Sequence, residues 1–166
     1  MQSNDLKQQL IERAHELGFD ACRIAPAVAP RHAAEFQEWL RDGAAGEMQW
    51  LERGESKRCD PQEVLAGARS VVVLAMSYWQ GELPAQSRQL RGRIARYAWG
   101  DDYHNVMLER LRALDELLRE HGGTQKCYVD TGPVLERDFA AEAGVGWHGK
   151  STMLLDAQLG TWFFLG

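Results

Sequence analysis

The apolar run Ser70–Met76, SVVVLAM, constrains the fold more than any other segment of this chain. It is rich in β-branched residues and too short for a typical buried helix, so it is the best candidate for a central strand. A chain of 166 residues with 45% hydrophobic and 26% charged residues has room for one domain around such a strand. No repeat, low-complexity tract or Pro/Ser linker divides residues 1–166, so we expect a single domain.

Helical periodicity recurs in segments 3–17, 31–40 and 103–121. The first segment ends at Gly18, and the third follows a cap at Asp101–Asp102. Their apolar faces consist of Leu6, Leu10, Ala14 and Leu17, then Phe36, Trp39 and Leu40, then Tyr103, Met107, Leu111, Leu114 and Leu118. We interpret all three stripes as core-facing.

Further strands are expected at 19–25 and 126–130, and a short helix from Pro133 through Ala143. The end of the chain, 152–166, predicts two strands joined by a turn at 156–160. Helices and strands alternate without a strict βαβ rhythm. The predicted fold class is therefore α+β, with a mixed or antiparallel sheet flanked by helices, rather than a Rossmann fold.

A glycine-rich segment, Gly144–Ser151, reads G-x-G-x-x-G-K-S and superficially matches both dinucleotide-binding and P-loop patterns. Its glycines follow a helix rather than a strand, and the residues after Lys150 are β-like. No helix N-terminus is then available to hold a phosphate. We therefore do not interpret the segment as a phosphate-binding loop.

The net charge of −5 argues against a dedicated nucleic-acid binder, whose surface is usually basic. One segment, Arg88–Arg96, nevertheless carries four arginines within nine residues and no acidic residue. Two interpretations stay open. The arginines contact phosphates, or they lie in a solvated loop where one or two of them bond neighbouring backbone carbonyls.

The amino-terminal sequence is polar and lacks an apolar targeting segment, and no apolar run is long enough to span a membrane, so we expect a cytoplasmic protein. Cys22, Cys59 and Cys127 are too far apart for a local zinc or iron–sulfur motif. We expect reduced, buried thiols. No histidine pair has the i, i+4 spacing of a zinc helix, so no metal site is predicted from the residues themselves.

Asp130 stands at the predicted end of a strand and before a predicted helix, a position typical of catalytic groups and equally of helix caps. Arg137 follows in the next helix, where it binds an anionic group or makes a surface salt bridge. Asp102-Tyr103-His104 has the D-x-H opening of a cobalt-ligating motif. Met107 occupies the position where that motif has glycine, so we interpret His104 as a first-turn residue of the helix.

Four blocks in this order resemble the signature blocks of the epoxyqueuosine reductases: GEMQWLER (46–53), RYAWGDDYH (96–104), YVDTGPVLER (128–137) and AGVGWHGKST (143–152). The resemblance runs from the first helix to Gly166. It implies that Asp130 is the catalytic acid and that Arg137 lies near the substrate pocket. It further implies cofactor contacts, some through backbone groups, for Arg53, Lys150, Ser151 and Leu154.

The resemblance also implies a fold like those of flavin nitroreductases and cobalamin-processing proteins. The reaction would remove the epoxide oxygen of epoxyqueuosine in tRNA, with cobalamin as electron source and an acid to protonate the oxygen. Family members carry two further runs of cysteines that hold two 4Fe–4S clusters, fed by flavodoxin or ferredoxin. This sequence ends at Gly166 without them, so we expect an excised domain that does not turn over with a physiological reductant.

Two other functions fit the residues. A reductive dehalogenase would share the corrinoid chemistry, but such enzymes typically carry a twin-arginine export signal, which is not seen here. A module that binds a corrinoid or flavin without catalysis is the third interpretation.

Overall fold

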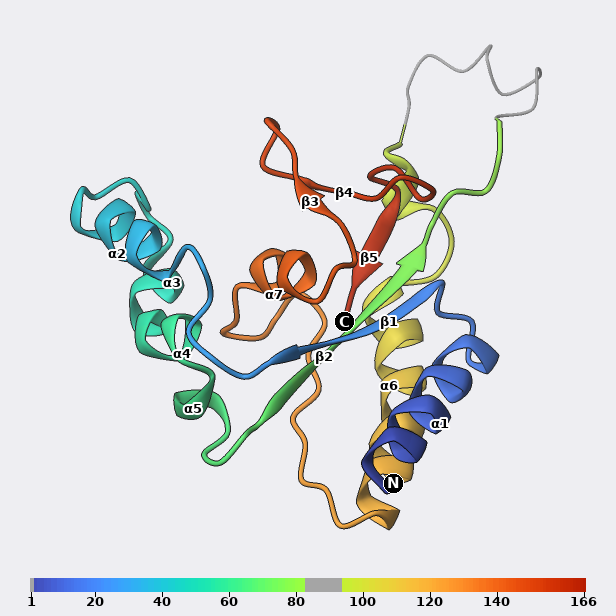
Figure 1. The fold of residues 1–166 in the computed structure, drawn as a ribbon. Helices are drawn as coiled ribbons and strands as arrows, with labels where there is room; N and C mark the ends of the chain where they lie inside the picture. Colours follow the sequence, from blue (N-terminus) through green and yellow to red (C-terminus); the bar gives the residue numbers. More distant parts are fainter. Residues whose placement is uncertain (1, 83–93) are drawn as a thin grey trace.

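The computed structural model describes residues 2–82 and 94–166, and its architecture is α+β, as predicted (Figure 1). A three-stranded antiparallel sheet contains β1 (Ala21–Pro26), β2 (Ser70–Ser77) and β5 (Phe163–Leu165), in the order β1-β2-β5. The apolar run 70–76 therefore forms the central strand. A β-branched sequence fits this position because both faces of the strand are covered.

The two neighbours of β2 pair with different lengths of it. β1 pairs from Ala21 opposite Ala75 to Pro26 opposite Ser70. β5 pairs only with the last three residues of β2, 75–77, and Gly166 extends this ladder by two hydrogen bonds with Leu74, of 2.8 and 3.0 Å. The first half of β2 is thus paired with β1 alone in the part of the chain that the structure describes.

Alternating residues of β2 supply two separate hydrophobic clusters, because successive side chains of a strand point to opposite faces. Leu74 packs with α1 (Gln2–Glu16) and α6 (Tyr103–Glu120) on one face, whereas Val73 and Ala75 pack with α7 (Glu136–Glu142) on the other. Figure 1 shows α1 and α6 side by side along one side of the sheet. The first cluster contains Leu10, Ala14, Phe19, Cys22, Leu74, Met107, Leu111, Leu114 and Val129.

The long helix α6 begins as the sequence predicts. The Asp102 carboxylate accepts a hydrogen bond of 3.0 Å from the backbone N–H of His104, which is an N-cap. His104 is accordingly a first-turn residue. The predicted stripe is buried at Met107, Leu111 and Leu114, so it belongs to the core.

Four short helices form a separate group away from α1 and α6 (Figure 1). They are α2 (Ala33–Arg41), α3 (Gln49–Arg53), α4 (Glu55–Cys59) and α5 (Pro61–Val64). The Gln62 side-chain amide donates to the carbonyls of Ala27 and Ala68, at 3.3 and 2.8 Å. This side chain fastens the group to the two ends of the loop that joins β1 and β2.

Two predicted elements differ from the structure. Residues 126–130 form no strand and run as coil. The Lys126 side chain in this coil donates from Nζ to the Val64 carbonyl at 2.6 Å. The helix expected from Pro133 begins only at Glu136. Residues 131–134 form bends instead of the first turn of a helix. Gly132 packs closely on Tyr128 there, and a Cβ atom at position 132 would lie 2.4 Å from the ring.

The predicted terminal hairpin is half correct. The turn exists, since Asp156 and Gly160 exchange backbone hydrogen bonds of 2.9 and 3.0 Å. The flanking strands do not pair with each other: β4 (Leu154–Leu155) pairs with β3 (Trp147–His148), and β5 joins the main sheet. In this second sheet, a Cβ atom on Gly146 would lie 2.1 Å from the Leu155 carbonyl oxygen. At least this glycine of the G-x-G-x-x-G-K-S segment serves the β3–β4 contact.

The three cysteines are free thiols, as predicted, but only Cys22 is buried. Burial raises the pKa of the Cys22 thiol to about 11. Cys59 is half-buried and Cys127 is exposed, so the expectation of burial is wrong for these two. Cys127 lies on the coil segment that was expected to be a strand, which explains its exposure.

Leu74→Ala tests the central position of β2. Leu74 is 2% exposed, so truncation should lower the free energy of unfolding by about 3–5 kcal/mol through lost burial and a cavity. Urea unfolding followed by circular dichroism measures this change. Val28→Ala, at a residue 57% exposed, is the control and should change stability by less than about 0.5 kcal/mol. Equal effects of the two substitutions would contradict the assignment of Leu74 to the core.

Candidate functional site

Asp130 lies in a strained three-residue turn. Its φ is 56°, a left-handed value that only one other non-glycine residue of the described chain adopts, Thr152 with φ 66°. The Thr131 N–H donates to the Val129 carbonyl at 2.6 Å and closes the turn. Such strain persists only where surrounding structure imposes it, and it is concentrated at functional sites. The turn therefore presents the Asp130 carboxylate in a fixed place.

The first turn of α6 supplies the partners of Asp130. The Tyr103 hydroxyl donates to Asp130 Oδ2, and His104 Nε2 lies 3.9 Å from the same oxygen. His104 Nδ1 lies 2.7 Å from Asp102 Oδ1, so the imidazole stands between two carboxylates. The hydrogen bonds from His104 lower the pKa of the Asp102 carboxyl. The sequence motifs point to Asp130, but no local signal places Tyr103 and His104 beside it.

The Tyr103 side chain is held as a hydrogen-bond donor. Its ring stacks on Phe164 of β5, with centroids 3.8 Å apart and an interplanar angle of 2°. Burial raises the pKa of the Tyr103 hydroxyl, and the bond to Asp130 raises it further. The hydroxyl therefore keeps its proton at physiological pH and can only orient the carboxylate.

Asp130 is not the cap of the following helix. The N-cap of α7 is Leu135, which has no side-chain cap, so the capping interpretation is wrong. The Asp130 side chain is 54% exposed. Its carboxylate faces solvent beside an aromatic ring and an imidazole.

The structure connects Arg137 with the predicted cofactor segment. The Arg137 guanidinium donates to the Thr152 carbonyl oxygen and lies 3.4 Å from Thr152 Oγ1. Thr152 belongs to the β3–β4 turn that also carries Lys150 and Ser151, both exposed. Neither of the two interpretations offered for Arg137, an anionic ligand or a salt bridge, describes this contact.

Leu154 and Arg53 lie elsewhere. Leu154 is 4% exposed within the cluster around Phe139 and Val145, so only its backbone can meet a ligand. Arg53 ends α3 in the separate helical group, where it is exposed and donates to Gln49 Oε1 at 3.1 Å. The described contacts thus join Arg137 to the Lys150–Ser151 turn but do not bring Arg53 to it.

An aromatic row leads from Asp130 to Arg96. Tyr103 stacks on Phe164, whose ring centroid lies 4.6 Å from that of Tyr78. The row continues through Trp162 and Trp79, whose ring centroids lie 5.1 Å apart. The Arg96 guanidinium lies over Trp79, 3.9 Å from the ring centroid, a cation–π contact.

Arg96 also donates to the Gly81 carbonyl oxygen, so for this arginine the interpretation of a backbone contact is confirmed. Arg88, Arg91 and Arg93 lie outside the described residues. Trp79 and Trp162 are 44% and 39% exposed, so this end of the row forms an open, partly cationic aromatic surface. No sequence pattern predicted this row, although Arg96 begins one of the signature blocks.

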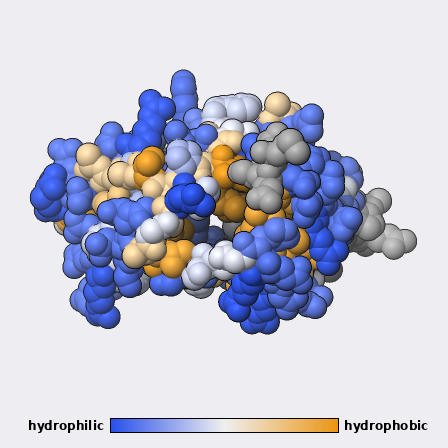
Figure 2. Space-filling model, turned by 60° about the horizontal axis from the view of Figure 1, so that its bottom comes forward, coloured by the Kyte–Doolittle hydropathy of each residue, from blue (hydrophilic) through white to orange (hydrophobic). Residues whose placement is uncertain are grey.

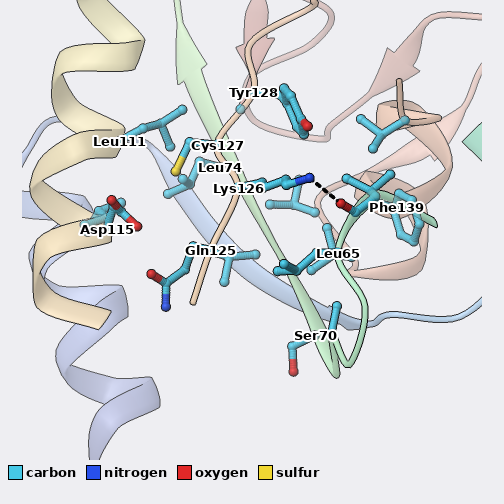
Figure 3. Close-up of a pocket in the computed structure, with 18 of the residues that line it drawn as sticks. Leu65, Ser70, Leu74, Leu111, Asp115, Gln125, Lys126, Cys127, Tyr128 and Phe139 are labelled. Atoms are coloured by element: carbon cyan, nitrogen blue, oxygen red, sulfur yellow. Dashed lines mark hydrogen bonds between the residues drawn. The ribbon is translucent and has the colours of Figure 1, made fainter. Parts of the chain in front are cut away.

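A separate apolar cleft lies on another side of the molecule. Figure 2 turns this side forward and shows apolar side chains gathered in its middle between hydrophilic flanks. In Figure 3 the cleft lies between α6, the first half of β2 and the coil 125–128, with the Lys126–Val64 hydrogen bond across it. Its volume is about 210 Å³, below the ~300–1,000 Å³ typical of small-ligand sites. Asp130 does not line it.

Glu136 links the cleft to the site. It lines the cleft, and its Oε1 is buried without a hydrogen-bond partner among the described residues. Burial, together with the nearby Asp130 carboxylate, raises the pKa of the Glu136 carboxyl to about 7, against the opposing charges of Arg58 and Arg137. Glu136 is therefore a proton-holding group next to the candidate site.

Known proteins similar to this chain are epoxyqueuosine reductases. Residues 58–131 match the family model described as epoxyqueuosine reductase QueG, DUF1730. An epoxyqueuosine reductase of Cyclobacterium marinum is 37% identical over 161 residues, which cover 95% of this chain and 52% of that protein. One from Gloeobacter violaceus is 44% identical over 164 residues, covering 95% and 50%.

Solved structures share the fold. A crystal structure of epoxyqueuosine reductase with an epoxyqueuosine-modified tRNA-Tyr stem loop matches with a TM-score of 0.83 and 30% identity, over 98% of this chain and 44% of that one. The Bacillus subtilis enzyme matches with a TM-score of 0.80 and 27% identity, over 98% and 44%; its structure has an aspartate-bearing catalytic loop swung out of the active site.

The fold places the chain among α+β proteins with an antiparallel sheet flanked by helices. The particular relatives are the epoxyqueuosine reductases, to which the chain is similar along almost its whole length. It spans about half the length of the curated relatives it matches. Among the described helices, none is long and apolar enough to cross a membrane.

Glu136→Gln tests the buried carboxyl. Between about pH 4.5 and 7 the folded protein holds a proton that the unfolded chain has released, so stability should fall as the pH rises through this window. The variant should lose this slope and exceed the wild type above about pH 7, by on the order of 1–3 kcal/mol. Urea unfolding across the window measures it. Glu142→Gln, at an exposed position of the same helix, should keep the slope, and a slope retained in Glu136→Gln would contradict the assignment.

Proposed function

We propose that this chain is the cobalamin-binding, tRNA-facing part of an epoxyqueuosine reductase, which removes the epoxide oxygen of epoxyqueuosine in tRNA. The observation that carries the proposal is the Asp130 carboxylate, held in a strained turn against Tyr103 and His104 at an open aromatic surface. The similarity to epoxyqueuosine reductases over 95% of the chain supports it.

Asp130 is the proton donor to the departing epoxide oxygen in this proposal. A general acid must hold its proton and lie within hydrogen-bond reach of the reacting atom. Asp130 is open to a ligand from solvent, and a substrate seated above it would supply the burial that the isolated chain does not. His104 Nε2 lies 3.9 Å from Asp130 Oδ2, so it would return a proton to Asp130 through one bridging water, whereas Tyr103 orients the carboxylate and keeps its own proton.

The side chains present fit a broad corrinoid better on an open face than in a cavity. The cleft of about 210 Å³ is too small for such a macrocycle. The β3–β4 segment instead exposes Trp147 and Met153, at 53% and 49%, beside Lys150. Apolar surface of this kind suits the face of a flat ring, and Lys150 suits a phosphate of the cofactor. When bound, the cofactor would supply the two electrons that no side chain can deliver.

The tRNA would meet the aromatic row. Unpaired bases stack on exposed tryptophans and on arginine planes, and Trp79, Trp162 and Arg96 offer both on the row that begins at Tyr103. The basic segment 88–96 continues from Arg96 and would contact phosphates. The two 4Fe–4S clusters and a flavodoxin or ferredoxin reductant would belong to the rest of a longer protein, and a cytoplasmic location remains part of the proposal.

Asp130→Asn tests the acid. Asn has the shape of Asp but cannot donate this proton, so conversion should fall ~10²–10⁴-fold. The assay is single-turnover conversion of an epoxyqueuosine-modified stem loop by this chain with cobalamin and a strong chemical reductant, which replaces the clusters. Melting temperature and the cobalamin absorbance spectrum should stay unchanged.

Asp101→Asn, at an exposed residue near the start of α6, is the control and should convert normally. Near-normal conversion by Asp130→Asn would overturn its role as the acid. Cobalamin binding by the wild type with no conversion at all would instead support a binding module without catalysis.

Arg53→Ala tests the cofactor contact inferred for that residue. Cobalamin affinity should fall with little dependence on salt, and stability should hardly change, because Arg53 is exposed and bonds only Gln49 among the described contacts. Arg41→Ala, at the exposed end of α2, is the matched control. In contrast, replacing Arg88 and Arg91 should reduce the salt slope of tRNA binding by about 2. Unchanged cobalamin affinity in Arg53→Ala would remove Arg53 from the site.

A further inference from the structure

Two histidines and one buried carboxylate meet outside the site around Asp130. His32 Nδ1 lies 2.8 Å from Asp138 Oδ1, and His148 Nε2 lies 3.1 Å from the same oxygen. The backbone N–H of His32 donates to the other carboxylate oxygen, Oδ2, at 2.8 Å. The imidazole rings meet edge to face, with centroids 5.1 Å apart. The three ligand atoms all lie within 4.8 Å of one another.

Three distant segments supply this cluster. His32 immediately precedes α2, Asp138 lies in α7, and His148 ends β3. Asp138 is the buried charged residue of the described chain, at 7% exposure, and a buried carboxylate is costly unless positive charge or several donors face it. The fold therefore brings two imidazoles to a carboxylate whose charge requires compensation.

We propose that His32, Asp138 and His148 bind a divalent transition-metal ion of the zinc and cobalt class. Two imidazole nitrogens and one carboxylate oxygen form a donor set that such ions favour. Bonds of ~2.0–2.2 Å at tetrahedral angles place ligand atoms about 3.3 Å apart. The two separations of 2.8 and 3.1 Å from Asp138 Oδ1 are close to this value, so a small outward movement of the rings admits the ion.

Binding of the ion requires no acid or base other than the two imidazole rings. A carboxylate oxygen only accepts hydrogen bonds, so in the ion-free protein each ring nitrogen that faces Oδ1 bears a proton. Ion binding requires these two nitrogens as lone-pair donors, and each neutral ring can move its proton to its other nitrogen. The His32 backbone N–H holds Oδ2 throughout, which leaves Oδ1 free for the ion.

The cluster is reachable from solvent and incomplete as a closed structural site. The side chains of His32 and His148 are 43% and 32% exposed, which gives an ion a path of entry. Three protein ligands leave at least one position for water or an anion. A bound ion would also fasten the start of α2 to α7 and β3, because each ligand comes from a different one of these elements.

The alternative is a hydrogen-bond network with no ion. It predicts that His148→Ala lowers stability equally with and without metal, and that no stoichiometric ion binding occurs. Metal binding predicts that added ion stabilises the wild type far more than the variant, because a ligand stabilises only the state that binds it. The two models therefore differ in the response to metal rather than in stability alone.

The test uses the 166-residue chain after treatment with a chelator. Addition of Co²⁺ should give visible d–d absorption bands that saturate at one equivalent, and Zn²⁺ should displace them. Saturating Zn²⁺ should raise the melting temperature by roughly 5–10 °C. His32→Ala and His148→Ala should each weaken binding by more than the ~10–100-fold that loss of an outer-shell partner costs.

Two controls separate this site from adventitious binding. His121→Ala removes an exposed imidazole at the end of α6 and should bind Co²⁺ like the wild type. Cys59→Ser removes the thiol that lies 3.7 Å from the carbonyl of Ala33, the first residue of α2, and should also bind normally. Absence of saturable Co²⁺ bands in the wild type overturns the proposal. Bands retained in His148→Ala, or lost in Cys59→Ser, overturn it as well.

Discussion

Antiparallel pairing on both edges of β2 organises the molecule. β1 pairs with residues 70–75 along one edge, and β5 with Gly166 covers the second half of the other. Because side chains alternate along β2, the same strand supplies Leu74 to the α1–α6 layer and Val73 to the α7 layer. The β5 pairing also brings Phe164 under Tyr103, which in turn positions the hydroxyl that meets Asp130. The site therefore depends on the register of a strand at the far end of the sequence.

Local sequence patterns correctly predicted the elements whose formation depends on residues close to them in the sequence. The β-branched run 70–76 and the capped stripe of α6 are examples, because burial and capping depend on neighbouring residues. Partners at long range were not predictable in this way. The turn at 156–160 was correct, but its two strands join different sheets, and a strand at 126–130 found no place in a ladder.

The candidate site shows the same division. The block resemblance identified Asp130 and Arg137, but it did not indicate that Tyr103 and His104, in another block, would face the carboxylate. His32 and Asp138 are 106 positions apart, and no spacing rule connects them. Only the packing of α7 against the sheet brings these side chains together. Sequence motifs thus identified individual residues of the site, whereas the residues that surround them in space could be identified only from the folded structure.

Helix α7 relates the three features described above. Its residues Glu136, Arg137 and Asp138 are consecutive, and a helix turns about 100° per residue, so their side chains leave in three directions. Glu136 reaches the apolar cleft, Arg137 reaches the turn at Thr152, and Asp138 reaches both histidines. An ion bound at Asp138 would limit rotation of α7 because His148 and His32 hold it from β3 and α2. Since Arg137 is the adjacent residue, the same restraint would fix the guanidinium against Thr152 and hold the turn that carries Lys150 and Ser151.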